Sequence, residues 1–310
     1  MSVDLSVVAT LYRSAPYLEE FHRRVAAAAE RAAPDFEVVL VNDGSPDESL
    51  EAAVALCGRD PRVRVVDLSR NFGHHKAMMT GLAHARGKRV FLIDSDLEEE
   101  PELLDGFLAE MGRTGADVVY GVQERRRGGL RERFTGWLFY SLFDLLTTHP
   151  IPRNLLTVRL MTRRYVEALL QHRDREIFLA GLWAITGFLQ VPLVVRKLDK
   201  GSTTYTLRRK ATILVNSVTA FSNRPLVIIF WLGMAISLAA GAAAAYMVVR
   251  RLFFGVLLAG WPSLIVSIWL LGGLTIFCVG ILGIYLSRIF TEVKDRPYTV
   301  VRQVYGEPPA

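Results

Sequence analysis

The sequence predicts an α/β domain with a doubly wound, mainly parallel sheet, followed by amphipathic interfacial helices and two transmembrane helices. Three observations support this fold class. Short apolar runs alternate with helix-like segments over residues 1–125, the last third of the chain holds two long apolar stretches, and carboxylates recur where the short runs end. Strands that alternate with helices are typical of a parallel sheet with helices on both faces.

The first strands and the helix between them are marked by their flanking residues. The apolar run at residues 5–11 predicts the first strand. Ser14 followed by Pro16 predicts the start of a helix, which Pro34 ends. The apolar run at 36–41 predicts the second strand.

The second predicted strand leads into the polar turn Asn42-Asp43-Gly44-Ser45. Ser45 and Glu48 have the spacing of a capping box, so we expect Ser45 to cap the next helix. Asp43 has two interpretations. Its carboxylate accepts hydrogen bonds from a nucleoside, or it is a turn residue that bonds its own backbone.

The remaining elements continue the alternation. Each predicted strand is short, apolar and bounded by charged or turn residues, as buried parallel strands are. The sequence predicts strands at 63–68, 90–94 and 117–121, a loop at 69–73, and helices at 75–86 and from Pro101 onward.

The fourth predicted strand ends in two carboxylates, Asp94 and Asp96, with Ser95 between them. In an open α/β sheet, ligands bind at the carboxyl ends of the strands. Two nearby carboxylates repel one another, and Mg²⁺ or Mn²⁺ bridging to a diphosphate would satisfy both. The alternative is that Asp94 caps the following turn and Asp96 is solvated, because D-x-D is a common pattern.

Composition and missing motifs exclude several classes of protein. The sequence has no G-x-G-x-x-G after the first strand and no P-loop, so neither a dinucleotide-binding fold nor a nucleotide hydrolase is indicated. The formal charge of +6 suits anionic headgroups or phosphate substrates, and we expect no nucleic-acid partner. Cys57 and Cys278 lie in different parts of the chain and are expected to be reduced, which fits a cytosolic face. The N-terminus has no signal segment, so we expect the first domain in the cytosol.

Three motifs follow one another along the first part of the chain: Val-Leu-Val-Asn-Asp-Gly-Ser at 39–45, Ser-Arg-Asn-Phe-Gly at 69–73 and Ile-Asp-Ser-Asp-Leu at 93–97. In this order they resemble the inverting glycosyltransferases with a GT-A fold. More narrowly, the sequence is similar to the polyprenyl-phosphate glycosyltransferases of the family 2 type, which include dolichol-phosphate mannose synthase and its bacterial undecaprenyl-phosphate relatives. The resemblance covers residues 5–225, and the two apolar spans that follow match the bacterial members.

The resemblance implies a metal-dependent enzyme that transfers one sugar, with inversion, from a nucleotide diphosphate sugar to polyprenyl phosphate. We expect a UDP-linked donor. Asp94 and Asp96 would be the catalytic carboxylates and, with Glu98, the ligands of Mg²⁺ or Mn²⁺, unless Glu98 is a solvated member of the acidic run at 98–100. The residues expected to contact the donor are Thr10, Tyr12, Asp43, Ser95 and Lys76.

The sequence departs from the family pattern at several motifs. Pro-x-Tyr-Asn-Glu after the first strand appears as residues 10–14, Thr-Leu-Tyr-Arg-Ser, which loses an acidic contact to the nucleotide. Leu-Gln after the D-x-D appears as Leu97-Glu98, Asp-Phe-Arg-Leu-Met as residues 157–161, and Gly-x-Ser-Lys-Tyr as residues 201–205. Because these positions hold sugar and acceptor, the changes bear on the identity of the sugar more than on the class of reaction.

Basic residues are concentrated at two places before the apolar spans. Arginine binds phosphate through two parallel hydrogen bonds, so we expect Arg125 and Arg126, with Arg208 and Lys210, to hold the acceptor phosphate. The alternative is a solvated basic loop near anionic lipid. Apolar residues after each cluster follow helical spacing and predict two helices in the membrane interface, although the first also fits a core helix.

Residues 226–249 and 264–286 have the length that a bilayer-spanning helix requires. Neither span has a charge in its interior, which argues against an ion or proton path. Basic residues on the outer flanks outnumber Arg250 and Arg251 in the connecting loop, so we expect both termini in the cytosol. The protein is therefore predicted to be a multi-pass protein of the bacterial inner membrane.

We interpret the chain as four segments: a GT-A nucleotide-sugar domain core at 1–125, an acceptor and interface region with two amphipathic helices at 126–225, two transmembrane helices at 226–287, and a cytosolic tail at 288–310. Residues 297–305 in the tail have the composition of a strand. In the bacterial relatives such tails pair with a neighbouring subunit, so we expect a homo-oligomer, for which a tetramer is one option.

Two other hypotheses remain open. One is a non-catalytic membrane scaffold of the same fold that binds nucleotide sugar or lipid phosphate. It is favoured by the changes at Arg13, Ser14 and Thr157, and the intact Asp94 and Asp96 argue against it. The other is a processive polysaccharide synthase, which would need more spans and a Gln-x-x-Arg-Trp motif that the sequence lacks.

Overall fold

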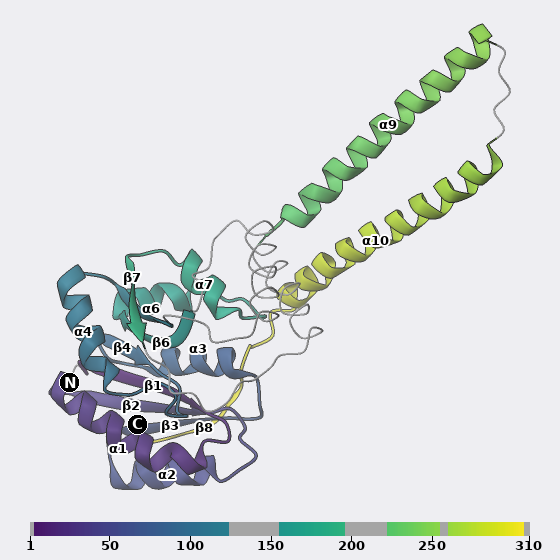
Figure 1. Ribbon diagram of the computed structural model, residues 1–310. Helices are drawn as coiled ribbons and strands as arrows, with labels where there is room; N and C mark the ends of the chain where they lie inside the picture. The colour runs from purple at the N-terminus through teal and green to yellow at the C-terminus, as the bar shows by residue number, and fades with distance from the viewer. Residues whose placement is uncertain (1–2, 124–154, 196–221, 255–259, 307–310) are drawn as a thin grey trace. The chain divides into compact units, whose positions relative to one another are not determined.

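The computed structural model divides the chain into two compact units, one with a mixed sheet and one with two long helices (Figure 1). The first unit comprises residues 1–133, 150–205 and 296–310, and the second comprises 134–149 and 206–295. Within them, the structure describes residues 3–123, 155–195, 222–254 and 260–306.

Four parallel strands form the centre of the first unit: β1 (Leu5–Leu11), β2 (Phe36–Asn42), β3 (Val63–Leu68) and β4 (Arg89–Leu92). They lie side by side in the order β4-β1-β2-β3. Almost all of their residues are buried because helices cover both faces, which explains why these strands are apolar without alternation. The predicted parallel core is therefore confirmed.

Four further strands complete an eight-stranded mixed sheet: β5 (Val118–Gln123), β6 (Leu155–Thr162), β7 (Gln190–Val195) and β8 (Val301–Tyr305). The full order is β7-β5-β6-β4-β1-β2-β3-β8. β6 is antiparallel to β4 and β5, and β8 is antiparallel to β3. The sequence predicted β5 and β8 but not β6 and β7, so the first unit extends well beyond residue 125. We expected the tail to pair with a neighbouring subunit, whereas β8 pairs with β3 of its own chain.

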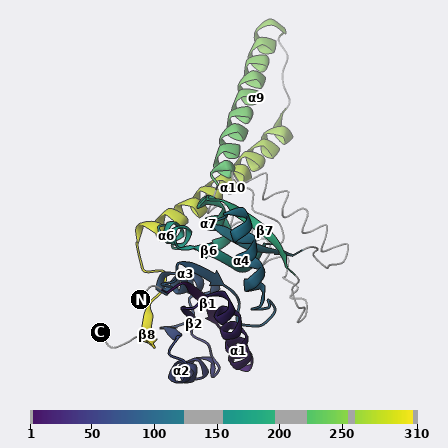
Figure 2. The same ribbon diagram turned by 90° about the vertical axis from the view of Figure 1, so that its left-hand side faces the viewer.

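The helices in the described part of the first unit cover the sheet: α1 (Ala15–Ala32), α2 (Ser49–Arg59), α3 (His74–His84), α4 (Leu103–Thr114), α6 (Arg163–Leu170) and α7 (Leu179–Ile185). α1 packs against α2 and α4, α4 also packs on β5, β6 and β7, and α3 packs on β1 and β2 and contacts α6 (Figure 2). The helix predicted from Ser14 and Pro16 is confirmed, since α1 begins directly after Ser14.

The expected cap of the second helix is wrong. α2 begins at Ser49 rather than after Ser45, and its N-cap residue Glu48 makes no side-chain cap hydrogen bond. The Ser45 hydroxyl instead donates to the Asp47 carboxylate and accepts the backbone N–H of Arg13 at 2.7 Å. A bond to a distant loop therefore replaces the local cap that the spacing predicted.

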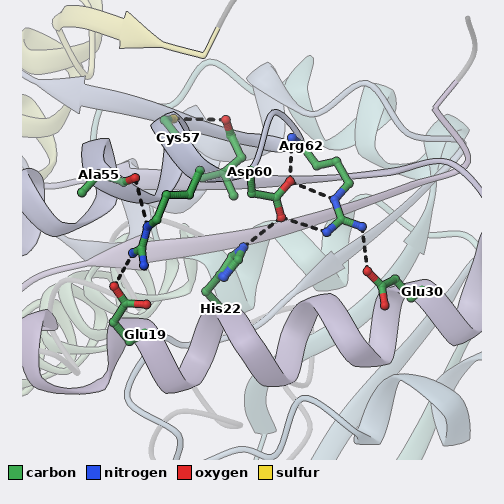
Figure 3. Close-up of polar contacts among 9 residues, drawn as sticks. Glu19, His22, Glu30, Ala55, Cys57, Asp60 and Arg62 are labelled. Carbon is green, nitrogen blue, oxygen red and sulfur yellow. Dashed lines mark hydrogen bonds and ion pairs between the residues drawn. The ribbon is translucent and has the colours of Figure 1, made fainter.

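A polar network fixes α1 against the turn after α2 (Figure 3). Asp60 accepts two hydrogen bonds from the Arg62 guanidinium, both at 2.9 Å, and one contact from His22 Nε2 at 3.1 Å. Arg62 also reaches Glu30 on α1 at 2.8 Å. Burial alone would raise the pKa of Asp60, but the side chain and backbone N–H of Arg62 lower it to about 2. The network therefore stabilises the folded sheet domain.

The described part of the second unit consists of α9 (Arg224–Phe254) and α10 (Trp261–Val293). Both are long and apolar enough to cross a membrane, as predicted, over Arg224–Ala243 and Ser267–Val293. The Tyr285 hydroxyl donates to the Ser222 carbonyl at 2.6 Å and ties α10 to the start of α9. The two predicted interfacial helices lie outside the described residues.

Candidate active site at the carboxyl ends of the parallel strands

The predicted site residues gather at one edge of the sheet. Thr10 lies near the end of β1, Asp43 follows β2, and Asp94 and Asp96 follow β4. The chain passes from β3 on one side of β1 to β4 on the other, so the strand order reverses between β1 and β4. Ligands of open α/β sheets bind at such a reversal.

Ser95 anchors the two aspartates that flank it. Its buried hydroxyl donates to the Thr10 carbonyl at 2.8 Å and is 2.9 Å from the Ser14 hydroxyl. We expected Ser95 to contact the donor, but its hydroxyl is engaged inside the protein. The backbone N–H of Glu98 donates to Asp96 at 2.9 Å. Leu97 between them has φ +60°, a left-handed conformation that non-glycine residues rarely adopt outside functional turns.

Asp43 holds the loop that follows β3. Its two carboxylate oxygens accept the backbone N–H groups of Phe72 at 2.7 Å and Gly73 at 3.0 Å. Burial raises the pKa of Asp43, and these two hydrogen bonds oppose that rise. Asp43 thus makes these two hydrogen bonds to the 69–73 loop, and not to its own turn or to an open nucleoside site. It joins the 42–45 turn to the 69–73 loop, which was one of the three sequence motifs.

His74 belongs to the site and was not predicted. Its Nδ1 lies 3.0 Å from the Thr10 hydroxyl and its Nε2 lies 3.3 Å from the Asp94 carboxylate. Burial lowers the pKa of His74, but the hydrogen bond and charge of Asp94, with the charges of Asp43 and Asp96, raise it overall. The three carboxylates therefore favour the protonated form of the imidazole. The only sequence signal was its place at the start of α3, directly after the 69–73 loop.

The turn after β1 offers a ring for stacking. Tyr12 is 49% exposed, and the Arg13 guanidinium lies 5.8 Å from the centre of its ring. Arg13 has φ +57°, a conformation that asparagine tolerates better than arginine. Thr10 points to His74, and Lys76 lies in the first turn of α3. Of the expected donor residues, Tyr12 is the one most open to solvent.

Asp47 ties the turns after β1 and β2 together. Its carboxylate accepts the Ser49 hydroxyl at 2.6 Å and the Ala15 backbone N–H at 3.3 Å, and it also accepts the Ser45 hydroxyl. Ser49 in turn accepts the Ser14 backbone N–H at 2.9 Å. These contacts fix the position of the loops on which Tyr12 and Asp43 stand.

The two aspartates suit a divalent metal in part. Carboxylate oxygens are the ligands that Mg²⁺ and Mn²⁺ prefer. The described part of the chain holds no group of three or more His, Cys, Asp or Glu residues that could bind a metal ion by itself. The assignment of Asp94, Asp96 and Glu98 as metal ligands therefore stays a prediction. Because Mg²⁺ is usually bound by one or two carboxylates together with substrate phosphates, Asp94 and Asp96 fit a metal that binds with a diphosphate.

Arg159, from the third departing motif, is a buried structural residue. It lies in β6, its guanidinium covers the Trp183 ring, and it donates to the backbone carbonyls of Thr157 at 3.1 Å and Leu156 at 3.2 Å. Burial lowers the pKa of Arg159 to about 9. Its side chain is therefore engaged with β6 and with Trp183 of α7 inside the sheet domain.

The expected acceptor residues Arg125, Arg126, Arg208 and Lys210 lie outside the described residues. Their assignment stays a prediction. The same holds for the Gly-Ser-Thr-Thr-Tyr segment at 201–205.

Comparison with known proteins gives consistent matches over the chain. The family model described as "Glycosyl transferase family 2" matches residues 6–170. A protein of Mycobacterium tuberculosis (strain CDC 1551 / Oshkosh), named provisionally among the glycosyltransferases, is 57% identical over 97% of this chain and 88% of its own length. The "SfII prophage-derived bactoprenol glucosyl transferase" of Shigella flexneri is 31% identical over 99% of this chain and 100% of its own length. The crystal structure of S. aureus TarS 1-349 in complex with UDP-GlcNAc is 20% identical, with a TM-score of 0.45 over 70% of this chain and 66% of that chain.

Proposed function

The chain belongs to glycosyl transferase family 2, and we propose that it transfers a single sugar from a nucleotide diphosphate sugar to polyprenyl phosphate at the cytosolic face of a bacterial membrane. One observation supports this most strongly. The similarity to a protein named bactoprenol glucosyl transferase extends over 99% of this chain and so includes both the sheet domain and the two membrane-length helices. We further propose a UDP-linked donor and inversion at the anomeric carbon.

The sheet domain would bind the donor at the reversal of strand order. Tyr12 would stack on the base, because its ring is half-exposed at the end of β1. Asp94 and Asp96 would hold Mg²⁺ or Mn²⁺ on the diphosphate. When bound, the metal offsets the negative charge that grows on the departing diphosphate. His74, whose imidazole lies 3.3 Å from the Asp94 carboxylate, would also donate a hydrogen bond to the diphosphate.

The chemical step needs little acid–base help from the protein. A phosphate oxygen of the lipid attacks the anomeric carbon from the side opposite the diphosphate. A new carbon–oxygen bond forms as the bond to the nucleoside diphosphate breaks, and the diphosphate leaves with the electron pair. Because a phosphate monoester is already anionic near neutral pH, no strong base is required. Catalysis then depends on placement and on stabilisation of the departing diphosphate by the metal ion that Asp94 and Asp96 would hold.

The acceptor half of the site is proposed from the sequence. Arg125, Arg126, Arg208 and Lys210 would hold the lipid phosphate, with α9 and α10 as a two-helix anchor and both termini in the cytosol. Arg208→Ala is expected to raise the Michaelis constant for the lipid roughly ten- to a hundredfold, as the loss of one charge-assisted contact would. Nucleotide binding should stay unchanged. Weaker UDP binding with an unchanged lipid dependence would assign Arg208 to the donor site instead.

The direct test is transfer by the detergent-purified full chain. Undecaprenyl phosphate and a panel of radiolabelled nucleotide sugars, with Mg²⁺ or Mn²⁺, should give a labelled lipid with at least one donor. A chain that binds UDP but labels no lipid with any donor would support the scaffold hypothesis. A labelled polymer longer than one sugar would support a processive synthase.

A further inference from the structure

The tail segment, residues 298–305, is built into the edge of the sheet next to the donor loops. β8 pairs with β3, and the Thr299 hydroxyl lies 2.8 Å from the Thr80 hydroxyl on α3. Gly306, directly after it, has φ +78°, and a Cβ there would lie 2.5 Å from the Val63 carbonyl oxygen. Because a side chain would collide with the backbone of β3, the end of the tail is fixed in position as well as in register.

The tail holds both backbone groups of Ser69, the first residue of the 69–73 loop. The Ser69 N–H donates to the Val300 carbonyl at 2.9 Å. Its carbonyl accepts a hydrogen bond from the Arg302 guanidinium at 2.7 Å. The loop therefore starts from a residue whose position the tail determines.

Arg302 also reaches the second donor loop through buried groups. Its guanidinium lies 3.3 Å from the carboxylate of Asp67, which is only 1% exposed. The other oxygen of Asp67 accepts a hydrogen bond from the side-chain NH₂ of Asn42 at 2.8 Å. The side-chain amide oxygen of Asn42 in turn accepts the backbone N–H of Ser45 at 3.2 Å. These contacts lead from the tail across β3 and β2 to the turn at 42–45.

The two routes meet at Asp43. This residue stands in the 42–45 turn and accepts the N–H groups of Phe72 and Gly73 at the end of the 69–73 loop. His74 follows the loop and contacts Asp94. Arg302 thus contacts the start of one loop and supports the base of the other, and these are the loops that carry the donor-side groups.

We propose that Arg302 is a positioning residue for the donor half of the active site, through which the tail after the second membrane-length helix holds the 42–45 turn and the 69–73 loop in their binding geometry. The proposal rests on the proposed function for the meaning of the donor site. Its physical basis is the buried charge of Asp67. Without Arg302 that carboxylate keeps one hydrogen bond from Asn42 and loses its cation, so Asp67 and the groups bonded to it should rearrange.

The test uses the full chain in detergent and compares Arg302→Ala and Arg302→Lys with wild type. Gln303→Ala is the matched control, because Gln303 is the next residue of the same exposed strand and lies opposite Asp67 in the register. Hydrogen–deuterium exchange of peptides covering 42–45 and 69–73 reports the loops, and UDP titration with Mg²⁺ reports the donor site. Transfer kinetics separate the Michaelis constants of donor and lipid.

Arg302→Ala is expected to speed exchange in both loops and to raise the dissociation constant for UDP roughly threefold to thirtyfold, as residues that couple to a site without touching its ligand do. The Michaelis constant for the lipid should not change. Arg302→Lys should fall between Arg302→Ala and wild type, since lysine keeps the charge but not the two-point contact. Gln303→Ala should match wild type.

Unchanged exchange in the two loops would overturn the proposal, and so would faster exchange with unchanged UDP affinity, because the tail would then order the loops without acting on the site. An equal effect of Gln303→Ala would also overturn it, since the strand as a whole, and not Arg302, would be responsible. Failure of the proposed function has a different signature. Wild type would then transfer no sugar or bind no UDP, while the exchange comparison would still decide whether Arg302 positions the loops.

Discussion

Replacing Asp43 by asparagine tests the donor loops directly. The Asp43 carboxylate is 3% exposed and accepts one backbone N–H on each oxygen, from Phe72 at 2.7 Å and from Gly73 at 3.0 Å. Asparagine keeps the shape but offers one oxygen. Its NH₂ group must face the second N–H, so one donor is left without an acceptor and the negative charge is lost. Water cannot replace the bond easily because the site is buried.

The cost follows from that geometry. A buried hydrogen bond to a charged group contributes about 1.5–3 kcal/mol, and about 1.4 kcal/mol is a tenfold change in an equilibrium constant. Part of this loss should appear as weaker folding and part as weaker donor binding. We expect about a tenfold rise in the dissociation constant for UDP, at the lower end of that range, because Ser69 keeps its own bonds to the tail.

The assay is UDP titration with Mg²⁺, run together with thermal unfolding of the same detergent preparation. Asp35→Asn is the control, since Asp35 is exposed and precedes β2 at the opposite end of the strand. It should bind and melt like the wild type. An Asp43→Asn protein that binds UDP as tightly as the wild type would refute the assignment of the 69–73 loop to the donor site.

Four further changes test the metal, the polar network and the packing of two glycines. Asp96→Asn should abolish transfer while the protein remains folded and membrane-bound, because an amide is a poor ligand for a hard cation; full activity of this variant in EDTA would contradict the metal assignment. The pKa of Asp60 is lowered from 3.8 to about 2, so its charge stabilises the fold by about 2 kcal/mol above pH 3.8 and loses this effect as the pH falls through 2; Asp60→Asn should cost that much at neutral pH and nothing near pH 2 in denaturant titrations. Gly81→Ala should destabilise the sheet domain by about 1–3 kcal/mol, because its Cβ would lie 2.5 Å and 2.9 Å from valine methyl groups of β1 and β2. Gly58→Ala in α2, where the space is open, should instead raise stability by up to about 1 kcal/mol.

The parallel core could be predicted because its signal is local. β1 to β3 begin at the residues expected from their apolar runs, and β4 begins one residue earlier. Strands that are buried on both faces are mainly apolar, which makes their runs visible in the sequence. β6 and β7 lack that signal. β6 carries the buried Arg159, whose charge interrupts the apolar pattern and is tolerated only because Trp183 covers it. β7 contains Pro192, which argues against a central strand, and β7 is indeed an edge strand.

The candidate site was predictable to a similar degree. Asp94 and Asp96 stand out because two carboxylates follow an apolar strand. His74 does not stand out in the sequence, because its role depends on contacts with Thr10 and Asp94. Both residues are distant from His74 along the chain, and the fold brings them close to it. The prediction that Ser45 caps α2 was wrong for the same reason, since its hydroxyl accepts the backbone N–H of Arg13, which is 32 residues away.

These long-range contacts also bear on the changed motif after β1. The family pattern has a glutamate where this chain has Ser14, and the loss of that acid was the main sequence argument for a non-catalytic scaffold. In the structure Ser14 is buried, and its hydroxyl lies 2.9 Å from the hydroxyl of Ser95, which in turn donates to the Thr10 carbonyl. A neutral chain of hydrogen bonds thus fixes the residue between Asp94 and Asp96 to the end of β1. Ser14 therefore has a structural role beside the two aspartates, and its replacement of the family glutamate is no argument against turnover.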